Sequence, residues 1–186
     1  MPRIALYGLP GAGKSTFAGL LAGELAAAGA DVVRLKLGAP LYDLQSVVYA
    51  VAGRPMLDAG AQDGKLLNAL GSELRRINPG ALTDAFAARV RQAEESRPHA
   101  VLVCDDLRAP DVEAVTTLAF TLVEVTAPDE VRRLRKQARA DLSAGDENHP
   151  TEAPIDAKPR WRVENTGTVE ELRVRAARLA AKVLAS

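Results

Sequence analysis

A glycine-rich segment near the start of the chain constrains the fold more than any other feature of the sequence. Residues 8–16 read Gly-Leu-Pro-Gly-Ala-Gly-Lys-Ser-Thr and match the pattern G-x-x-x-x-G-K-[ST] in full. The apolar run 3–7 precedes this segment, and a helical pattern rich in Leu and Ala follows it at 15–28. A strand, a glycine loop and a helix in this order form the loop that wraps around nucleotide phosphates. The sequence therefore predicts a phosphate-binding loop that opens an α/β fold.

Each position of this loop has a physical role in holding phosphate. Glycines let the backbone turn so that successive N–H groups point at phosphate oxygens, and the helix N-terminus adds partial positive charge. Lys14 would bridge the β- and γ-phosphates, the Ser15 hydroxyl would ligate Mg²⁺, and Thr16 would contact the α-phosphate region. The residues expected to bind ATP are Gly8, Gly11, Ala12, Gly13, Lys14, Ser15 and Thr16.

Short apolar runs alternate with longer helical patterns along the whole chain. The runs expected as strands are 3–7, 31–36, 100–104, 120–126 and 161–164, and the segments expected as helices are 15–28, 41–52, 62–77, 78–96, 110–118, 128–142 and 168–185. Five strands separated by helices predict a doubly wound, five-stranded parallel sheet in three α/β/α layers. Continuously apolar strands suit a sheet that is covered on both faces.

The spacing of these elements predicts one domain, 1–186, with two appended parts. The core comprises 1–38 and 98–186. A helical insertion of about 39–97 separates the second and third strands and has the size of an acceptor-binding part. The polar, proline-containing stretch of about 139–158 is expected to form a lid.

Composition excludes several classes of protein. The chain has 186 residues, and its 24 Lys and Arg balance 24 Asp and Glu, whereas nucleic-acid binders usually carry a basic excess. Cys104 is the only cysteine, which excludes an intramolecular disulfide and a thiolate zinc cluster. No apolar run approaches the ~18 residues of a membrane span. Because no signal-peptide pattern opens the chain, we expect a cytoplasmic protein.

Acidic and basic residues at particular positions add to the phosphate-binding hypothesis. Asp105 and Asp106 directly follow the strand at 100–104, where a second acidic ligand for Mg²⁺ would stand, and the choice between them stays open. Arg108 follows this pair, and Arg135 and Arg139 are spaced for one helix face. Arginines in such places neutralise the charge that develops during phosphoryl transfer.

Several short segments, in order along the chain, resemble one known family. They are the loop at 8–16, Ala39-Pro40-Leu41, Leu70-Gly71-Ser72-Glu73-Leu74-Arg75-Arg76, Asp106-Leu107-Arg108-Ala109-Pro110, His149-Pro150-Thr151-Glu152 and Glu164-Asn165-Thr166-Gly167-Thr168. Together they resemble the P-loop nucleoside monophosphate kinase-like family, and within it the bacteriophage-type deoxynucleoside monophosphate kinases. The last segment is shared with other small-molecule kinases and discriminates little.

The resemblance implies transfer of a phosphoryl group from ATP, with Mg²⁺, to a (deoxy)nucleoside monophosphate. By position, Arg76 would hold the acceptor 5′-phosphate, Arg108 would lie near the transferred group, and Arg135 and Arg139 would clamp ATP as the lid closes. The catalytic residues implied are Lys14, Arg108, Arg135 and Arg139. The acceptor-binding residues implied are Lys36, Pro40, Tyr42, Arg76, Asp106, Arg108, His149 and Glu152, and the metal ligands are Ser15 with Asp105 or Asp106.

Departures from the family pattern leave the acceptor base and sugar open. Tyr42 stands where a lysine commonly follows the Ala-Pro-Leu element, and Ala109 stands where an aromatic residue is common. Two alternatives therefore remain: a kinase for another small metabolite, such as dephospho-coenzyme A, a sugar acid or a specialised nucleotide, and a regulatory ATP-binding switch. The expected partner is a small nucleotide acceptor, with no nucleic acid and no membrane, and a homodimer is left open.

Overall fold

A sheet of five parallel strands forms the centre of the computed structural model, which describes residues 1–56, 61–138, 142–143 and 149–185. The strands are β1 (Arg3–Tyr7), β2 (Val32–Leu35), β3 (Val101–Cys104), β4 (Thr121–Thr126) and β5 (Trp161–Glu164), in the sheet order β2-β3-β1-β4-β5. The doubly wound parallel sheet expected from the sequence is thereby confirmed. No helix among these described residues is long and apolar enough to cross a membrane.

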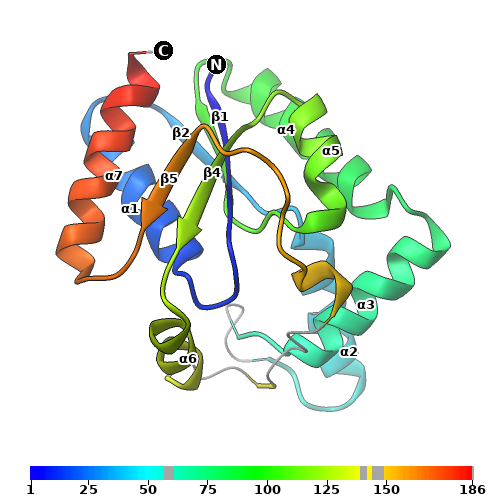
Figure 1. Cartoon of the computed structure of the whole chain (residues 1–186). Helices are drawn as coiled ribbons and strands as arrows, with labels where there is room; N and C mark the ends of the chain where they lie inside the picture. The colour runs from blue at the N-terminus through cyan, green and yellow to red at the C-terminus, as the bar shows by residue number, and fades with distance from the viewer. Residues whose placement is uncertain (57–60, 139–141, 144–148, 186) are drawn as a thin grey trace.

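Helices connect the strands and cover both faces of the sheet (Figure 1). They are α1 (Lys14–Ala27), α2 (Ala39–Val51), α3 (Gly64–Ile77), α4 (Ala81–Ser96), α5 (Val112–Thr117), α6 (Asp129–Gln137) and α7 (Val169–Leu184), with short 3₁₀ turns η1 (Ala109–Asp111) and η2 (Pro150–Glu152). β1 lies between β3 and β4 at the centre of the sheet. The strands β2 and β3 lie on one side of β1 and the strands β4 and β5 on the other, so the strand order switches direction at β1. Ligands of such folds bind beyond the carboxyl ends of the strands at this switch point.

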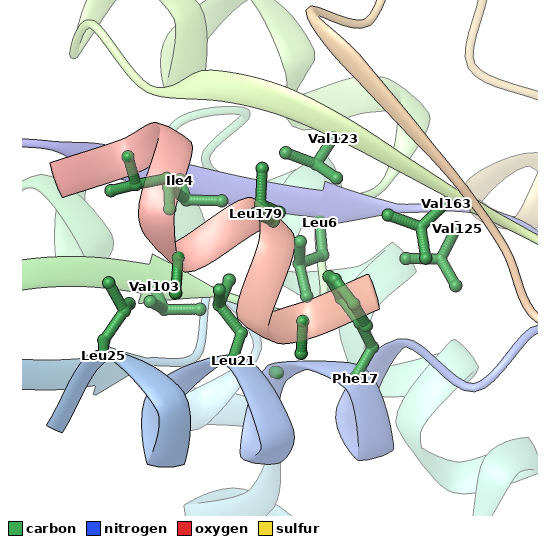
Figure 2. Close-up of a cluster of buried hydrophobic side chains, with 14 of the residues drawn as sticks. Ile4, Leu6, Phe17, Leu21, Leu25, Val103, Val123, Val125, Val163 and Leu179 are labelled. Carbon is green, nitrogen blue, oxygen red and sulfur yellow. The ribbon is translucent and has the colours of Figure 1, made fainter. Parts of the chain in front are cut away.

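The helices α1 and α7 cover one face of the sheet. Figure 2 shows Phe17, Leu21 and Leu25 of α1 facing Leu179 of α7 and the valines of the strands. The α1 residues recur every four positions, which places them on one side of that helix. Burial of each such side chain contributes about 1.5–3 kcal/mol. This packing holds the first turn of α1 directly after the glycine loop.

The opposite face is covered mainly by α4 and α5. Phe86 of α4 packs against Phe120, with ring centroids 5.5 Å apart, and Leu82 and Val90 extend the same buried row. The α2 and α3 helices contact each other and lie at the end of the molecule where the strands have their carboxyl ends (Figure 1). They occupy the first part of the stretch 39–97 expected as an acceptor-binding insertion, whereas α4 belongs to the same stretch but packs against the sheet.

Four local expectations differ from the structure, one of which is that the helix expected at 128–142 spans only Asp129–Gln137. The helix expected to start at Asn78 starts at Ala81, because the Asn78 side chain instead accepts a hydrogen bond from the N–H of Gly80 and turns the chain after α3. The helix expected at 110–118 is divided into η1 and α5, and a 3₁₀ turn, η2, forms in the stretch expected as a loop. The capping box of Thr168 and Glu171 at the start of α7 is confirmed.

Candidate active site

The glycine loop joins β1 to α1 and adopts backbone angles that suit glycine. Gly8, Gly11 and Gly13 have φ angles of 143°, 80° and 92°, in a region that L side chains rarely adopt. A Cβ atom on Gly8 would lie 2.1 Å from the main-chain oxygen of Val125. A Cβ on Gly11 would lie 2.6 Å from the main-chain oxygen of Arg132, and one on Gly13 would lie 2.2 Å from Asn165 Nδ2. The loop therefore packs closely against β4, against α6 and against the residue that follows β5.

Asn165 and two arginines of α6 hold this loop from outside. The Asn165 side chain, 4 % exposed, donates from Nδ2 to the Ala12 main-chain oxygen over 2.8 Å. Arg135 donates to Asn165 Oδ1 over 3.1 Å, and Arg132 donates to the Pro10 main-chain oxygen over 3.2 Å. The sequence indicated neither the role of Asn165 nor that of Arg132, because both depend on partners more than a hundred residues away.

A cavity of about 540 Å³ lies over the loop. Inside the loop, Lys14 Nζ donates to the main-chain oxygen of Gly8 over 2.7 Å. The cavity is lined by many of the predicted site residues, which are Lys14, Ser15, Thr16, Asp105, Asp106, Arg108 and Arg135, and by Lys36 and Tyr42, which were expected on the acceptor side. Gly8 and Ala12 instead line an adjoining cavity of about 180 Å³ together with Arg108. Arg139 lies outside the described residues.

The two carboxylates that follow β3 have different partners. Asp106 accepts hydrogen bonds from the N–H groups of Leu37, at 2.8 Å, and Gly38, at 2.9 Å, and so fixes the chain after β2. Asp105 is buried and forms an ion pair with Arg34 at 3.0 Å. Both carboxylates line the same cavity as Ser15. Successive residues of a strand point to opposite faces of the sheet, but β3 ends at Cys104, so this alternation does not separate Asp105 from Asp106.

These oxygens fit a magnesium ion that is held mainly by nucleotide phosphates. Ser15 offers a hydroxyl. Asp106 Oδ1 accepts from both the Leu37 N–H and the Cys104 thiol, whereas Asp106 Oδ2 accepts from the Gly38 N–H and has a second lone pair for another contact. Mg²⁺ usually keeps several waters and takes one or two protein carboxylates plus phosphate oxygens. Within the described stretches, no group of three or more His, Cys, Asp and Glu side chains forms a metal site of its own.

A second cavity opens beside the first, between α2, α3 and η1. Its polar lining comprises Tyr42, Gln62, Asn68, Arg75, Asp106, Arg108, Asp111 and Thr151, and its apolar lining includes Leu41 and Leu67. Four residues, Tyr42, Gln62, Asp106 and Arg108, line both this cavity and the one over the glycine loop. The two cavities are therefore neighbours with a shared wall at Asp106 and Arg108.

Two adjacent arginines of α3 have opposite environments. Arg75 lines the second cavity, where its Nη2 donates to both carboxylate oxygens of Asp111, at 3.0 and 2.8 Å. Burial raises the pKa of Asp111 even though the Arg75 charge opposes that effect. Arg76, expected to hold the acceptor phosphate, is 68 % exposed, pairs with Glu73 and lines neither cavity. The structure thus places Arg75, rather than Arg76, at the second cavity.

The remaining acceptor candidates lie around the start of α2 and near η2. The Lys36 ammonium lies over the Tyr42 ring, 4.9 Å from its centroid. Pro40 lies in the first turn of α2 and is absent from the lining of both cavities. His149 bonds to the Ser72 hydroxyl over 2.9 Å and to the Thr151 hydroxyl over 2.8 Å, so it ties the start of η2 to α3. The Glu152 side chain lies outside the described part of the chain.

Asp63 connects the start of α3 with the stretch expected as a lid. Its carboxylate caps α3 by accepting from the Leu66 N–H over 3.1 Å, and it also accepts from the hydroxyls of Tyr49, over 2.7 Å, and Ser143. Burial acts to raise the pKa of Asp63, but these hydrogen bonds outweigh burial and the pKa is lowered. Sequence patterns did not indicate this contact, since 80 residues separate Asp63 from Ser143.

Comparison with known proteins identifies the fold. Neither the protein-family models nor the curated proteins searched contain a match for this sequence. Solved structures do match along nearly the full length. A sugar kinase from Janibacter sp. is 14 % identical, with a TM-score of 0.56 and coverage of 99 % of this chain and 94 % of the other.

Two further kinases have similar folds. The APS kinase of Mycobacterium tuberculosis, solved with AMPPNP and APS, is 18 % identical, with a TM-score of 0.53 and coverage of 100 % of this chain and 98 % of the other. A gluconokinase from Sinorhizobium meliloti is 16 % identical, with a TM-score of 0.51 and coverage of 98 % and 93 %. At these identities the likeness shows the fold alone, which this chain shares with these three kinases.

Proposed function

We propose that this protein transfers the γ-phosphoryl group of ATP to a (deoxy)nucleoside monophosphate, giving ADP and the corresponding diphosphate. The observation that carries the proposal is the shared wall of the two cavities, where Arg108 faces the glycine-loop side and the α2/α3 side at once. Phosphoryl transfer depends mainly on positioning donor and acceptor in line and on neutralising charge between them. A guanidinium at the junction suits that task, because it binds phosphate oxygens in a planar, bidentate way.

On the donor side, the glycine loop and the first turn of α1 bind the phosphates of ATP. Backbone N–H groups and the Lys14 ammonium stabilise the charge on the β- and γ-phosphates, and Arg135 approaches from α6. Magnesium bound at Ser15 and one of the two aspartates would supply further neutralisation of the phosphate charge. The neighbouring fold of an APS kinase solved with AMPPNP supports an adenine nucleotide as donor.

On the acceptor side, the second cavity offers groups that suit a phosphate joined to a polar planar ring. Arg75 supplies a guanidinium, Tyr42 an aromatic face, and Gln62 and Asn68 amides that both donate and accept hydrogen bonds. In the reaction, an oxygen of the acceptor phosphate bonds to the γ-phosphorus while the bond from that phosphorus to the ADP oxygen breaks. We assign the acceptor phosphate to Arg75 and Arg108.

The lid is the third part of the proposal. Arg135 lies on α6, shortly before the stretch 139–158. Within that stretch, Ser143 bonds to Asp63, the N-cap of α3, and His149 bonds to Ser72 of α3. These bonds join the donor-side helix to the acceptor-side helix through the lid. A closed lid excludes water, which would otherwise accept the phosphoryl group and hydrolyse ATP. Arg139 and Glu152 stay assigned to this lid by their position in the sequence.

A panel of acceptors tests the proposal. ADP release from ATP would be measured with each ribo- and deoxyribonucleoside monophosphate, and with gluconate, adenosine 5′-phosphosulfate and dephospho-coenzyme A as other acceptor classes. We expect at least one nucleoside monophosphate to raise ADP release far above the rate with ATP alone. Release stimulated only by another acceptor class would favour a kinase for that metabolite, and release that no acceptor changes would favour a regulatory ATP-binding switch.

The Lys14→Ala variant supplies the control for this panel. Loss of the Lys14 charge is expected to lower acceptor-dependent turnover by several orders of magnitude, roughly 10³-fold or more. Activity that survives this substitution would mean that the turnover arises elsewhere than at the glycine loop.

A further inference from the structure

We propose that the groove between β5 and α7 is a second anion-binding site, suited to a short oligophosphate chain. The groove is a cavity of about 490 Å³, similar in size to the cavity over the glycine loop. No residue lines both cavities, so the groove is a separate site. Figure 1 shows α7 beside β5, the edge strand of the sheet.

Three cations of α7 line the groove and have no carboxylate partner within the described residues. They are Arg175, Arg178 and Lys182. Their spacing of three and four positions places them on one helix face, with axial separations of about 4.5 and 6 Å. Three like charges on one face repel one another, which disfavours the helix unless an anion neutralises them. Arg173, by contrast, pairs with Glu170 on another side of α7.

The wall formed by β5 and the residue before it adds an aromatic ring and two further cations, Arg160 and Arg162. Trp161 is partly buried against the apolar core, and the Arg160 guanidinium lies 4.8 Å from the centroid of its ring. Stacking on an aromatic ring orients a guanidinium without using its N–H donors in the ring plane. Those donors remain suited to phosphate oxygens. Arg162 of β5 also lines the groove, but its guanidinium pairs with Glu124. The groove thus presents five cationic groups around one aromatic residue, and four of them have no carboxylate partner within the described residues.

The extent of the positive charge favours a short anion over a long one. Glu164 lines the same groove, and Glu170 and Glu171 lie in the first turn of α7 beyond it. The carboxylates in the first turn of α7 limit the positively charged surface at that end of the helix. The chain as a whole has a formal net charge of zero. A nucleic-acid backbone would need a basic track that continues past the groove. The Cα positions of the three α7 cations span about 10 Å along the helix axis, and their long side chains can converge on a short phosphate chain.

Trp161 supplies an internal probe, because it is the only tryptophan in the sequence. The full-length Lys14→Ala protein, whose glycine loop is weakened, would be titrated with inorganic tripolyphosphate and, separately, with ATP. Trp161 fluorescence and isothermal titration calorimetry would be recorded for each. We expect saturable binding of tripolyphosphate in both wild type and Lys14→Ala. Equal affinity for the two probes would identify the phosphate chain as the ligand, and tighter binding of ATP would identify a nucleoside polyphosphate.

The matched variants are Arg178→Glu/Lys182→Glu, which reverses two groove charges, and Arg173→Glu, which reverses a charge elsewhere on α7. All three side chains are exposed, and thermal unfolding would verify that each variant folds. The double variant is expected to weaken tripolyphosphate binding about tenfold or more, and Arg173→Glu about twofold or less. The proposal is overturned by an absence of saturable binding in Lys14→Ala, by equal effects of the two variants, or by a single-stranded oligonucleotide that binds more tightly than tripolyphosphate.

Discussion

The side-chain amide of Asn165 donates a hydrogen bond to the main-chain oxygen of Ala12 over 2.8 Å and so ties the end of β5 to the centre of the glycine loop. The carbonyl oxygen of the same amide accepts from Arg135 over 3.1 Å. One buried side chain therefore joins the loop, the edge strand and α6. Because a phosphate-binding loop acts through fixed N–H directions, the rigidity supplied by Asn165 bears directly on donor binding.

Replacement of Asn165 by Ala is expected to loosen the loop. The Ala12 oxygen would lose its side-chain donor and Arg135 would lose an acceptor, which together lower the free energy of unfolding by about 1–3 kcal/mol. The KM for ATP is expected to rise about tenfold. Denaturant unfolding and steady-state kinetics would measure both. Thr166→Ala, at the exposed neighbouring position, is the control and should change unfolding by less than about 0.5 kcal/mol; equal effects would contradict the role given to Asn165.

Gly8 offers a test of the close approach between the loop and β4. In Gly8→Ala the new Cβ would meet the Val125 main-chain oxygen at 2.1 Å, and the φ angle of 143° is unfavourable for alanine. We expect a loss of about 2–4 kcal/mol in unfolding free energy together with weaker ATP binding. Gly23→Ala in α1 has open space around the Cβ and should instead stabilise the helix by about 0.5–1 kcal/mol. Similar unfolding curves for the two variants would contradict the close contact between Gly8 and the main-chain oxygen of Val125.

The two adjacent arginines of α3 can be separated by kinetics. Arg75→Ala is expected to raise the KM for the acceptor about a hundredfold, with little change in the KM for ATP, because one guanidinium–phosphate contact is lost. Arg75→Ala also leaves the buried Asp111 carboxylate without its partner, which lowers stability. The variant Arg75→Lys, which keeps a positive charge, is therefore assayed alongside, and all assays are run well below the unfolding temperature. Arg76→Ala removes only an exposed pair with Glu73 and should change neither constant by more than about threefold. A larger acceptor effect in Arg76→Ala than in Arg75→Ala would reverse the assignment.

Asp63 predicts a specific dependence of stability on pH. Its folded-state pKa lies below the ordinary value of 3.8, since hydrogen bonds from Ser143, Leu66 and Tyr49 outweigh burial. A lowered carboxyl pKa stabilises the fold above the ordinary value, and that contribution is lost as the pH falls toward the folded pKa. Wild type should therefore unfold at a higher temperature than Asp63→Asn at neutral pH, and the difference should shrink below about pH 4. Asp43→Asn, at an exposed carboxylate of α2, is the control, and a difference that grows on acidification would contradict the prediction.

Local patterns were sufficient to predict the sheet, the glycine loop and several helix ends. Continuous apolar runs such as Val101–Val103 form strands only where helices cover both faces, and the sequence shows enough helices to do so. The capping box at Thr168 depends on residues three apart, so it too was predictable. Each of these features is set by neighbours along the chain.

Features that depend on distant partners were not predictable in this way. Arg75 and Arg76 differ by about 100° around α3, and the choice between them depends on where η1 places Asp111. Arg132 has the pattern of a solvated helix face, yet its guanidinium bonds to Pro10, which is 122 residues away. Asn78 has the chemistry of a helix N-cap, but the chain direction after α3 assigns its side chain to a turn.

Under the proposed function, the two cavities that meet at Arg108 pass the γ-phosphoryl group of ATP to a nucleoside monophosphate and not to water. The most direct measurement follows γ-labelled ATP in the presence of each (deoxy)nucleoside monophosphate and separates the products. The label should appear in a nucleoside diphosphate roughly 10³ times faster than in inorganic phosphate, and Lys14→Ala should abolish that transfer. Label that enters only inorganic phosphate, whichever monophosphate is present, would contradict the account.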